Sequence, residues 1–382
     1  MEYIALKDIC DINPQIQGID DDTEISFVPM SSVSEDGKID TLDIRKYGNV
    51  KKGYMVFQEN DVLFAKITPC MENGKGAIAR SLKNGIGCGS SEFYVLRPNK
   101  ESVLSEWIYY LTSWGWFRKE AEKHMTGSAG QRRVSRVYLE NYLIKVPALQ
   151  EQLKQVQLLA KLQKIIENRK RELSCMDNLI KARFVELMDS VELSEETTVE
   201  KITEIVKVGF VGTCEKFYTD ESGIPMLRTG NITDKGIDLK DLKYVTEEFH
   251  EKNKKSQIHE GDLLIARHGS NGQANVYYGA EAQCLNAVVI VPNQSVARSI
   301  FLAGLINSPM VKEQIDRTLV GSTQHVVNTK SIASLKVRIP DLTVQKQYED
   351  FVKQVDKSKV VVQKALDETQ LLFDSLMQKY FG

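Results

Sequence analysis

Polar side chains that can form hydrogen bonds gather in short loops that follow apolar stretches of the sequence. In the C-terminal half, residues 228–231 follow one apolar run, and residues 267–273 follow the strand-like run Leu263–Ala266. Such loops supply Arg, Asn and Gln, the side chains that pair bidentately with guanine or adenine edges in the major groove of DNA. We therefore predict that the following side chains in these loops contact DNA: Arg228, Thr229, Asn231, Arg267, His268, Ser270, Asn271 and Gln273.

The N-terminal half carries loops of different sequence at the equivalent places. Residues 66–68 and 72–75 follow the run at 61–65, which matches the strand before residue 267. If both halves bind DNA, this divergence indicates that they read two different sequences. The predicted DNA contacts in this segment are Lys66, Thr68, Asn73 and Lys75.

A Gly-Ser turn occurs in both halves, at residues 127–133 and 321–326. Small residues permit close approach of the backbone to a phosphate, and the nearby arginines, Arg136 included, could neutralise its charge. For any single loop residue, a solvated side chain without a ligand remains an alternative. The predicted DNA contacts in the two turns are Gln131, Arg132, Arg133, Gln324 and His325.

Motifs for independent catalysis are not recognisable. A DNA adenine methyltransferase would need a second proline and an aromatic residue after Asn13-Pro14, and the glycines at 85–89 lead into a strand instead of a helix. No phosphate-binding loop for ATP is found, and the five histidines lack metal-site spacing. The six cysteines form no CxxC pair. We expect a non-catalytic chain without a cofactor or metal of its own.

The strongest organising signal is a duplication of the whole pattern. Residues 61–66 match residues 262–267, and the segment that begins at Phe93 matches the one at Ala287 with an offset of 194 that holds through the Gly-Ser turns. A second shared motif, Pro-x-Leu-x-x-Gln, then precedes a long helical stretch in each half. The repeating unit is therefore a mixed segment of about 150 residues followed by a helix of about 40, which is the size of a domain.

Both helical stretches carry apolar residues at gaps of three, four and seven, which indicates one apolar face. At 1.5 Å per residue each helix is about 55 Å long, too long for one small domain, so we expect helix to pack on helix. The stripes thin out at residues 167–172 and 356–359, where the pairing should tolerate charge. Cohesion alone is one interpretation of the pair; the other is a spacer that also docks partners.

The predicted fold class is α+β, with two repeated domains related by a pseudo-two-fold axis and two long helices that pair as an antiparallel coiled coil. Each domain should contain short strands and one helix near its end, at residues 106–125 and at residues 297–319 with an interruption at Ser308-Pro309. Trp107 and Phe117 are expected in the core. The predicted segments are residues 1–148, 149–190, 191–342 and 343–382.

Composition limits the functional classes. At 382 residues the chain can form two or three domains, and its hydrophobic fraction of 42% is typical of globular proteins. No apolar run is long enough to span a bilayer and the start lacks a signal-peptide pattern, so we expect a cytoplasmic protein without a membrane partner. The net charge of −2 indicates that DNA contact uses local basic patches, or that partners supply positive charge.

Taken in order along the chain, these features resemble the specificity subunit of Type I restriction-modification enzymes, and the resemblance covers essentially the whole sequence. It is carried by Asp61 and Asp262, residues 87–98, the Gly-Ser-x-Gln turn at 321–324, and the Pro-x-Leu-x-x-Gln motifs at 147–152 and 340–345. The resemblance implies two target-recognition domains that each read one half of a bipartite site in double-stranded DNA. The paired helices would set the gap between the halves.

The resemblance also implies partners: two methylation subunits docked on the helices and, through them, the restriction subunits that translocate DNA. S-adenosylmethionine, ATP and Mg would then be bound by those partners. We expect partner contacts from Gln152, Arg169, Lys170 and Gln345. The alternative is a coiled-coil adaptor that binds proteins without DNA specificity, which explains the near-neutral charge but not the divergent Arg/Asn/Gln loops.

Overall fold

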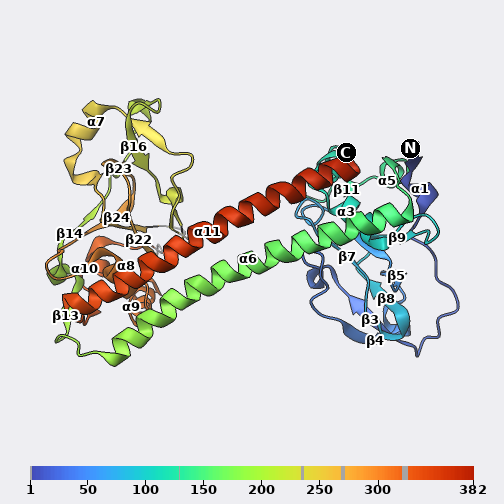
Figure 1. Ribbon diagram of the computed structural model, residues 1–382, viewed down its shortest axis with the longest axis horizontal. Coiled ribbons are helices and arrows are strands. Elements are labelled where there is room, and N and C mark those ends of the chain that lie inside the picture. The colour runs from blue at the N-terminus through green and yellow to red at the C-terminus, as the bar shows by residue number, and fades with distance from the viewer. Residues whose placement is uncertain (1, 129, 234–235, 268–271, 321–325) are drawn as a thin grey trace. The chain divides into compact units, whose positions relative to one another are not determined.

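The computed structural model describes residues 2–128, 130–233, 236–267, 272–320 and 326–382 (Figure 1). Its internal contacts divide the chain into two compact units. Unit 1 comprises residues 1–169 and 365–382, and unit 2 comprises residues 170–364. Each unit therefore combines one mixed α and β portion with part of each long helix. In the described part of the chain, no helix is both long and apolar enough to cross a membrane.

Unit 1 contains two four-stranded sheets. The first is antiparallel, in the order β2 (Cys10–Ile12), β9 (Phe93–Pro98), β6 (Val62–Ala65) and β7 (Gly76–Ile78). The second has the order β4 (Asp43–Lys46), β3 (Glu24–Val28), β8 (Ile86–Gly89) and β5 (Met55–Gln58), and β3 and β8 pair in parallel. Short antiparallel pairs join β1 (Tyr3–Ala5) to β12 (Leu143–Lys145) and β10 (Met125–Thr126) to β11 (Arg133–Val134).

Unit 2 repeats the topology of both sheets, with one added edge strand, β15, in the second, which confirms the predicted duplication. Its antiparallel sheet has the order β14 (Thr203–Val208), β24 (Ala287–Pro292), β21 (Leu263–Ala266) and β22 (Ala274–Val276). Its second sheet has the order β15 (Tyr218–Thr219), β19 (Lys243–Val245), β16 (Ile224–Leu227), β23 (Ala282–Cys284) and β20 (Gln257–Ile258), and β16 and β23 pair in parallel. Antiparallel pairs join β13 (Thr197–Thr198) to β25 (Lys336–Val337) and β17 (Ile232–Thr233) to β18 (Gly236–Ile237).

The central strands are buried on both faces. Every side chain of β6 and of β21 is buried, which is why both read as continuous apolar runs. Successive residues of a strand point to opposite faces. Phe64 accordingly packs in the cluster that contains Trp107 and Phe117, whereas Leu63 packs in the cluster around Phe57. Trp107 and Phe117 are therefore core residues, as predicted.

The shorter helices depart from the prediction in one respect. Unit 1 has α1 (Leu6–Ile9), α2 (Tyr47–Val50), α3 (Ser105–Ser113), α4 (Gly115–Lys123) and α5 (Arg136–Glu140). Unit 2 has α7 (Glu247–Lys252), α8 (Ser299–Ile306), α9 (Pro309–Val320) and α10 (Thr329–Ala333). The single helix expected over residues 106–125 is wrong. It breaks at Trp114, which is extended at φ −63° and ψ 126° and whose buried indole contacts the ring of Phe381.

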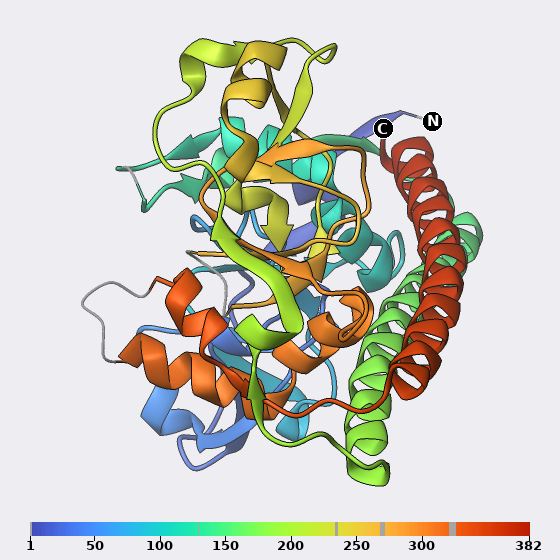
Figure 2. The same ribbon diagram turned by 90° about the vertical axis from the view of Figure 1, so that its left-hand side faces the viewer.

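The two predicted long helices are confirmed as α6 (Leu149–Ser190) and α11 (Leu342–Phe381), drawn in green and red in Figure 2. Within unit 1, Leu159 of α6 belongs to the same core cluster as Phe381 at the end of α11. Within unit 2, the ring of Phe184 near the end of α6 lies 5.2 Å from that of Tyr348 near the start of α11. The helices therefore run antiparallel.

Charged and polar groups fill the helix pair where its apolar stripes thin out, as expected. In unit 1 the Arg169 guanidinium donates to the Ala365 carbonyl and the Thr369 hydroxyl of α11. In unit 2 the Lys359 ammonium lies 2.7 Å from the Asp177 carboxylate of α6. Arg169 and Lys359 are each partly buried, and these contacts give both cations a partner, whereas Asp177 is exposed.

Candidate nucleic-acid interface

Two segments of unit 1 that were predicted to contact DNA lie side by side. The loop after β6 is joined to the hairpin strand β11 by a β-bridge between Ile67 and Arg133. The Thr68 amide donates to the Arg132 carbonyl at 3.0 Å, and the Val134 amide donates to the Lys66 carbonyl at 2.9 Å. The fold therefore brings these loops together although more than 60 residues separate them in the sequence.

Glu92, which sequence reasoning missed, joins these segments. It lies directly before β9, and its carboxylate accepts two hydrogen bonds from Arg133, at 2.9 Å from Nε and 2.8 Å from the second terminal nitrogen. Its backbone carbonyl accepts from the Lys66 amide. The hydrogen bonds from Arg133 hold the pKa of the Glu92 carboxyl below its usual value, so this ion pair is charged at neutral pH.

Arg132 also has acidic neighbours. Its guanidinium lies 3.4 Å from the Glu122 carboxylate and 3.8 Å from that of Glu72. Glu72 in turn accepts a 2.7 Å hydrogen bond from the Thr68 hydroxyl. The side chain of Gln131 is exposed. Because these arginines pair with carboxylates, they add little net positive potential to this surface. The small net charge of the whole chain, −2, is in keeping with this.

The other predicted side chains of this loop have different environments. The ammonium of Lys66 lies 5.1 Å from the centre of the Tyr94 ring, and burial lowers its pKa. Lys75 donates to the Met30 carbonyl at 3.1 Å, while Asn73 is exposed. A ligand can therefore reach Asn73 directly, whereas Lys75 is partly occupied within the chain.

A buried arginine of α4 holds the loop after β6 in place through hydrogen bonds to its backbone. Arg118 is 6% exposed, and its guanidinium donates to the carbonyls of Met71 and Lys75. Burial lowers its pKa to about 10. No sequence signal distinguishes this arginine from the exposed ones, because its role depends on the distant carbonyls that it meets in the fold.

In unit 2, the turn at residues 228–231 is stabilised by its own asparagine. Asn231 is 5% exposed; its side-chain oxygen accepts from the Arg228 amide and its nitrogen donates to the carbonyls of Asp238 and Lys240. The expectation that Asn231 contacts DNA is therefore corrected: a buried amide with these partners shapes the turn. Arg228 lies at 3.2 Å from the Asp241 carboxylate.

The two predicted loops of unit 2 meet at Asn286, which precedes β24 as Glu92 precedes β9. The Arg267 guanidinium donates to the Asn286 side-chain oxygen at 2.9 Å, and the Thr229 hydroxyl donates to its backbone carbonyl at 3.2 Å. Gln273 is partly exposed. Five predicted contacts lie outside the described residues: His268, Ser270, Asn271, Gln324 and His325.

The glutamines at the starts of the long helices do not face a partner. Gln152 is fully buried; its side-chain oxygen accepts from the Leu104 amide, and its nitrogen donates to the carbonyls of Ser102 and Pro147. The bonds with Leu104 and Ser102 fasten the start of α6 to the loop before α3, and the bond to Pro147 ties it to the segment that leads into α6. The expectation that Gln152 binds a partner is corrected, because its polar atoms are occupied inside unit 1.

Gln345 repeats this arrangement at the start of α11. It is fully buried, accepts from the Arg298 amide, and donates to the carbonyls of Val296 and Pro340. Its expected partner contact is corrected in the same way. Of the other two predicted partner contacts, Arg169 bonds to α11 as described above, and Lys170 is exposed on α6.

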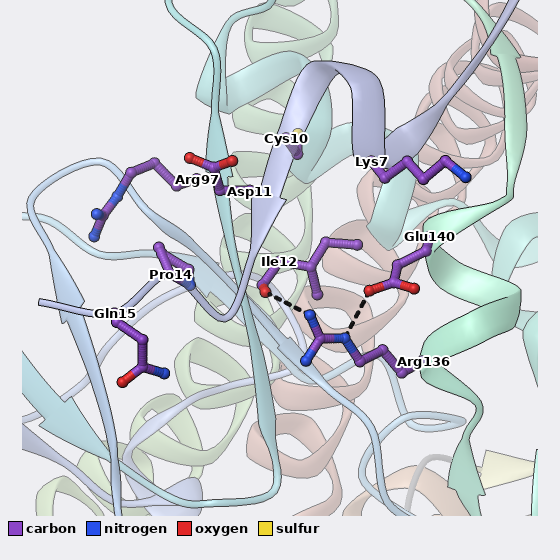
Figure 3. A pocket seen from close by; sticks show the side chains of 9 residues that line it. All are labelled: Lys7, Cys10, Asp11, Ile12, Pro14, Gln15, Arg97, Arg136 and Glu140. Carbon is purple, nitrogen blue, oxygen red and sulfur yellow. Dashed lines mark hydrogen bonds and ion pairs between the residues drawn. The ribbon is translucent and has the colours of Figure 1, made fainter.

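A polar pocket of about 450 Å³ lies in unit 1 between β2 and α5 (Figure 3). Arg136, considered above as a phosphate contact, donates to the Glu140 carboxylate at 2.7 Å and to the Ile12 carbonyl at 3.4 Å. Arg97 at the opposite side makes two hydrogen bonds to Asp61. Among the described residues, no group of three or more His, Cys, Asp or Glu side chains is arranged to hold a metal ion.

The model of the family described as Type I restriction modification DNA specificity domain matches residues 1–174 and 194–369. The specificity subunit of the Type I restriction enzyme EcoEI from Escherichia coli is 39% identical over 200 residues, which is 51% of this chain and 34% of that relative. The match therefore spans about a third of the relative's length.

Two solved structures share the fold over nearly the whole chain. One, from work on complex assembly and conformational transition of the type I R-M system, has a TM-score of 0.59 at 17% identity and covers 99% of this chain and 96% of that one. The other, a Type I S subunit from M. genitalium, has a TM-score of 0.58 at 14% identity and covers 100% of this chain and 96% of that one. At these identities the likeness concerns the fold alone.

Proposed function

Because the chain belongs to the family of Type I restriction-modification DNA specificity proteins, we propose that it is the sequence-recognition subunit of such an enzyme. Each unit would bind one half of a bipartite site in double-stranded DNA. The chain itself would carry out no chemistry. S-adenosylmethionine, ATP and Mg would be bound by partner subunits that methylate, translocate and cut cytoplasmic DNA.

The observation that carries this proposal is a repeated junction with different side chains. In each unit the residue directly before β9 or β24, which is Glu92 or Asn286, bonds to an arginine. The residue directly after the paired strand, β6 or β21, is Lys66 in unit 1 and Arg267 in unit 2. Repeated strands thus support a changed set of donors and acceptors, which is the arrangement required to read two unlike half-sites.

The long helices supply surfaces for the proposed partners, two methylation subunits and through them the restriction subunits. In unit 1, Leu158 and Ile165 of α6 are each 40% exposed and lie seven residues apart, hence on one face. In unit 2, Val360 and Val361 of α11 are each 69% exposed. In this proposal, these exposed apolar side chains are the surfaces on which the partner subunits dock.

We predict that Ile165→Glu weakens binding of the methylation subunit by at least about tenfold, because a charge would be buried in an apolar contact. The melting temperature of the free chain should change little, since Ile165 is already partly exposed. Lys164→Glu, at an exposed position on another face of α6, is the matched control. Equal binding by both variants, measured by calorimetry, would contradict docking on this face.

The alternative of a protein-binding adaptor without DNA specificity is not favoured, because the matched family is a DNA specificity domain. A gel-shift titration with random-sequence duplexes separates the two functions. The chain assembled with its methylation subunits should select one bipartite sequence, whereas the chain alone should bind DNA weakly because its net charge is −2. Absence of any preference at every salt concentration would refute the proposed function.

A further inference from the structure

Arg133 differs from the other candidate DNA contacts in the rigidity of its support. It lies in strand β11, where it pairs with Thr126 of β10, and it also forms a β-bridge to Ile67. Its side chain is nevertheless 42% exposed. Recognition side chains mounted on strands are held more accurately than those on free loops, so the position of this guanidinium is well defined.

Its orientation is fixed as well. Nε and one terminal nitrogen of Arg133 donate to the two carboxylate oxygens of Glu92, and the other terminal nitrogen donates to the Gln131 carbonyl at 3.1 Å. A guanidinium has five N–H donors. Among the contacts of the described residues, three are occupied, which leaves one donor on each terminal nitrogen.

We propose that Arg133, held in this orientation by Glu92, reads a guanine in the half-site bound by unit 1. Guanine presents two adjacent acceptors, O6 and N7, in the major groove, and a guanidinium that offers two neighbouring N–H groups pairs with both. Glu92 is then a positioning residue that acts through Arg133. This inference rests on the proposed function and assigns one base-reading group within it.

The carboxylate favours a base over a phosphate as the ligand of Arg133. A phosphate at this position would lie close to the Glu92 carboxylate, and like charges repel. An arginine whose charge is already neutralised also gains little from the release of counterions, which drives phosphate contacts. A neutral base edge with two acceptors suffers neither disadvantage.

Unit 2 supplies an independent example of the same construction. Asn286 occupies the place of Glu92, and its side-chain oxygen accepts from Arg267 at 2.9 Å. Here the supporting group is a neutral amide. The arginine comes from the loop after β21, which corresponds to the loop after β6 in unit 1. The junction therefore orients an arginine in both units, and the change of its chemistry suits it to distinguish one half-site from the other.

The test uses the complete complex with its methylation subunits and selects bound sequences from random duplexes. Arg133→Lys keeps the charge but removes the fork, so discrimination for guanine at one base pair should fall about five- to a hundredfold. Glu92→Gln should reduce discrimination at the same base pair, while binding to unselected duplexes tightens because a negative charge is removed. The half-site of unit 2 should be unchanged in both variants, which reports that the complex is folded.

Arg80→Lys is the matched control, because Arg80 forms an exposed ion pair with Glu106 in the same unit. It should leave every base preference unchanged. If Arg133→Lys weakened binding uniformly without altering any base preference, Arg133 would be a phosphate contact and the inference would be wrong. A wild-type complex without any sequence preference would overturn the proposed function itself, which separates the two failures.

Discussion

Gln152→Leu is expected to lower the free energy of unfolding of unit 1 by about 3–5 kcal/mol, because each buried polar group left without a partner costs about 1–3 kcal/mol. Leucine is close to glutamine in size but makes none of its hydrogen bonds. The Leu104 amide and the carbonyls of Ser102 and Pro147 would lose the partner that the fully buried Gln152 side chain supplies. The start of α6 would then be poorly fastened to its unit.

Tryptophan fluorescence during urea unfolding measures this effect selectively, because all three tryptophans, Trp107, Trp114 and Trp116, lie in unit 1. Gln157→Leu, at an exposed position of α6, should change the unfolding free energy by less than about 0.5 kcal/mol. Gln345→Leu should destabilise unit 2 while affecting the tryptophan signal less. If Gln152→Leu were no more destabilising than Gln157→Leu, the fastening role would be wrong.

Exchange of residues 203–333 for the matching segment of another family member is expected to replace the half-site read by unit 2 and to leave the other half-site intact. The exchange joins at the start of β14 and the end of α10, so that both long helices and the β13–β25 pair come from this chain. Each mismatched base pair in a specific site costs about 1–3 kcal/mol. Loss of three base contacts should therefore weaken binding to the original site by about a hundredfold or more.

The measurement for this exchange is a binding titration with duplexes that carry the original or the new half-site, at fixed salt. Arg267→Lys in the unexchanged chain is a second variant with a smaller expected effect, because it removes the guanidinium that bonds to Asn286 but keeps the positive charge. An exchange that altered both half-sites, or neither, would contradict the assignment of one half-site to each unit.

The features that could be predicted from the sequence are those set by apolar periodicity. The buried strands β6 and β21 are continuous apolar runs, and the long helices carry apolar residues at helical spacing over about 40 positions. Their duplication was visible because core strands tolerate few changes of pattern. The helix break at Trp114 was not predicted; the buried indole at the break contacts Phe381 from the far end of the chain, and no local pattern reveals that contact.

The candidate site was only partly predictable, because a polar residue type does not reveal whether its side chain is buried. Asn231 and Gln152 were both expected to meet ligands, yet each is occupied by backbone groups of its own unit. Glu92 was missed because its partner, Arg133, lies 41 residues away and reaches it only through the pairing of two loops. Arg118 was missed for the same reason.

The most direct test of the central claim is a base-resolution map of methylated adenines in a host that carries this chain with its methylation subunits. The proposed function predicts that all methylated sites share one sequence made of two specific halves and an unspecified gap of constant length. Methylated sites without a shared sequence, or with a single continuous one, would contradict the reading of one half-site by each unit.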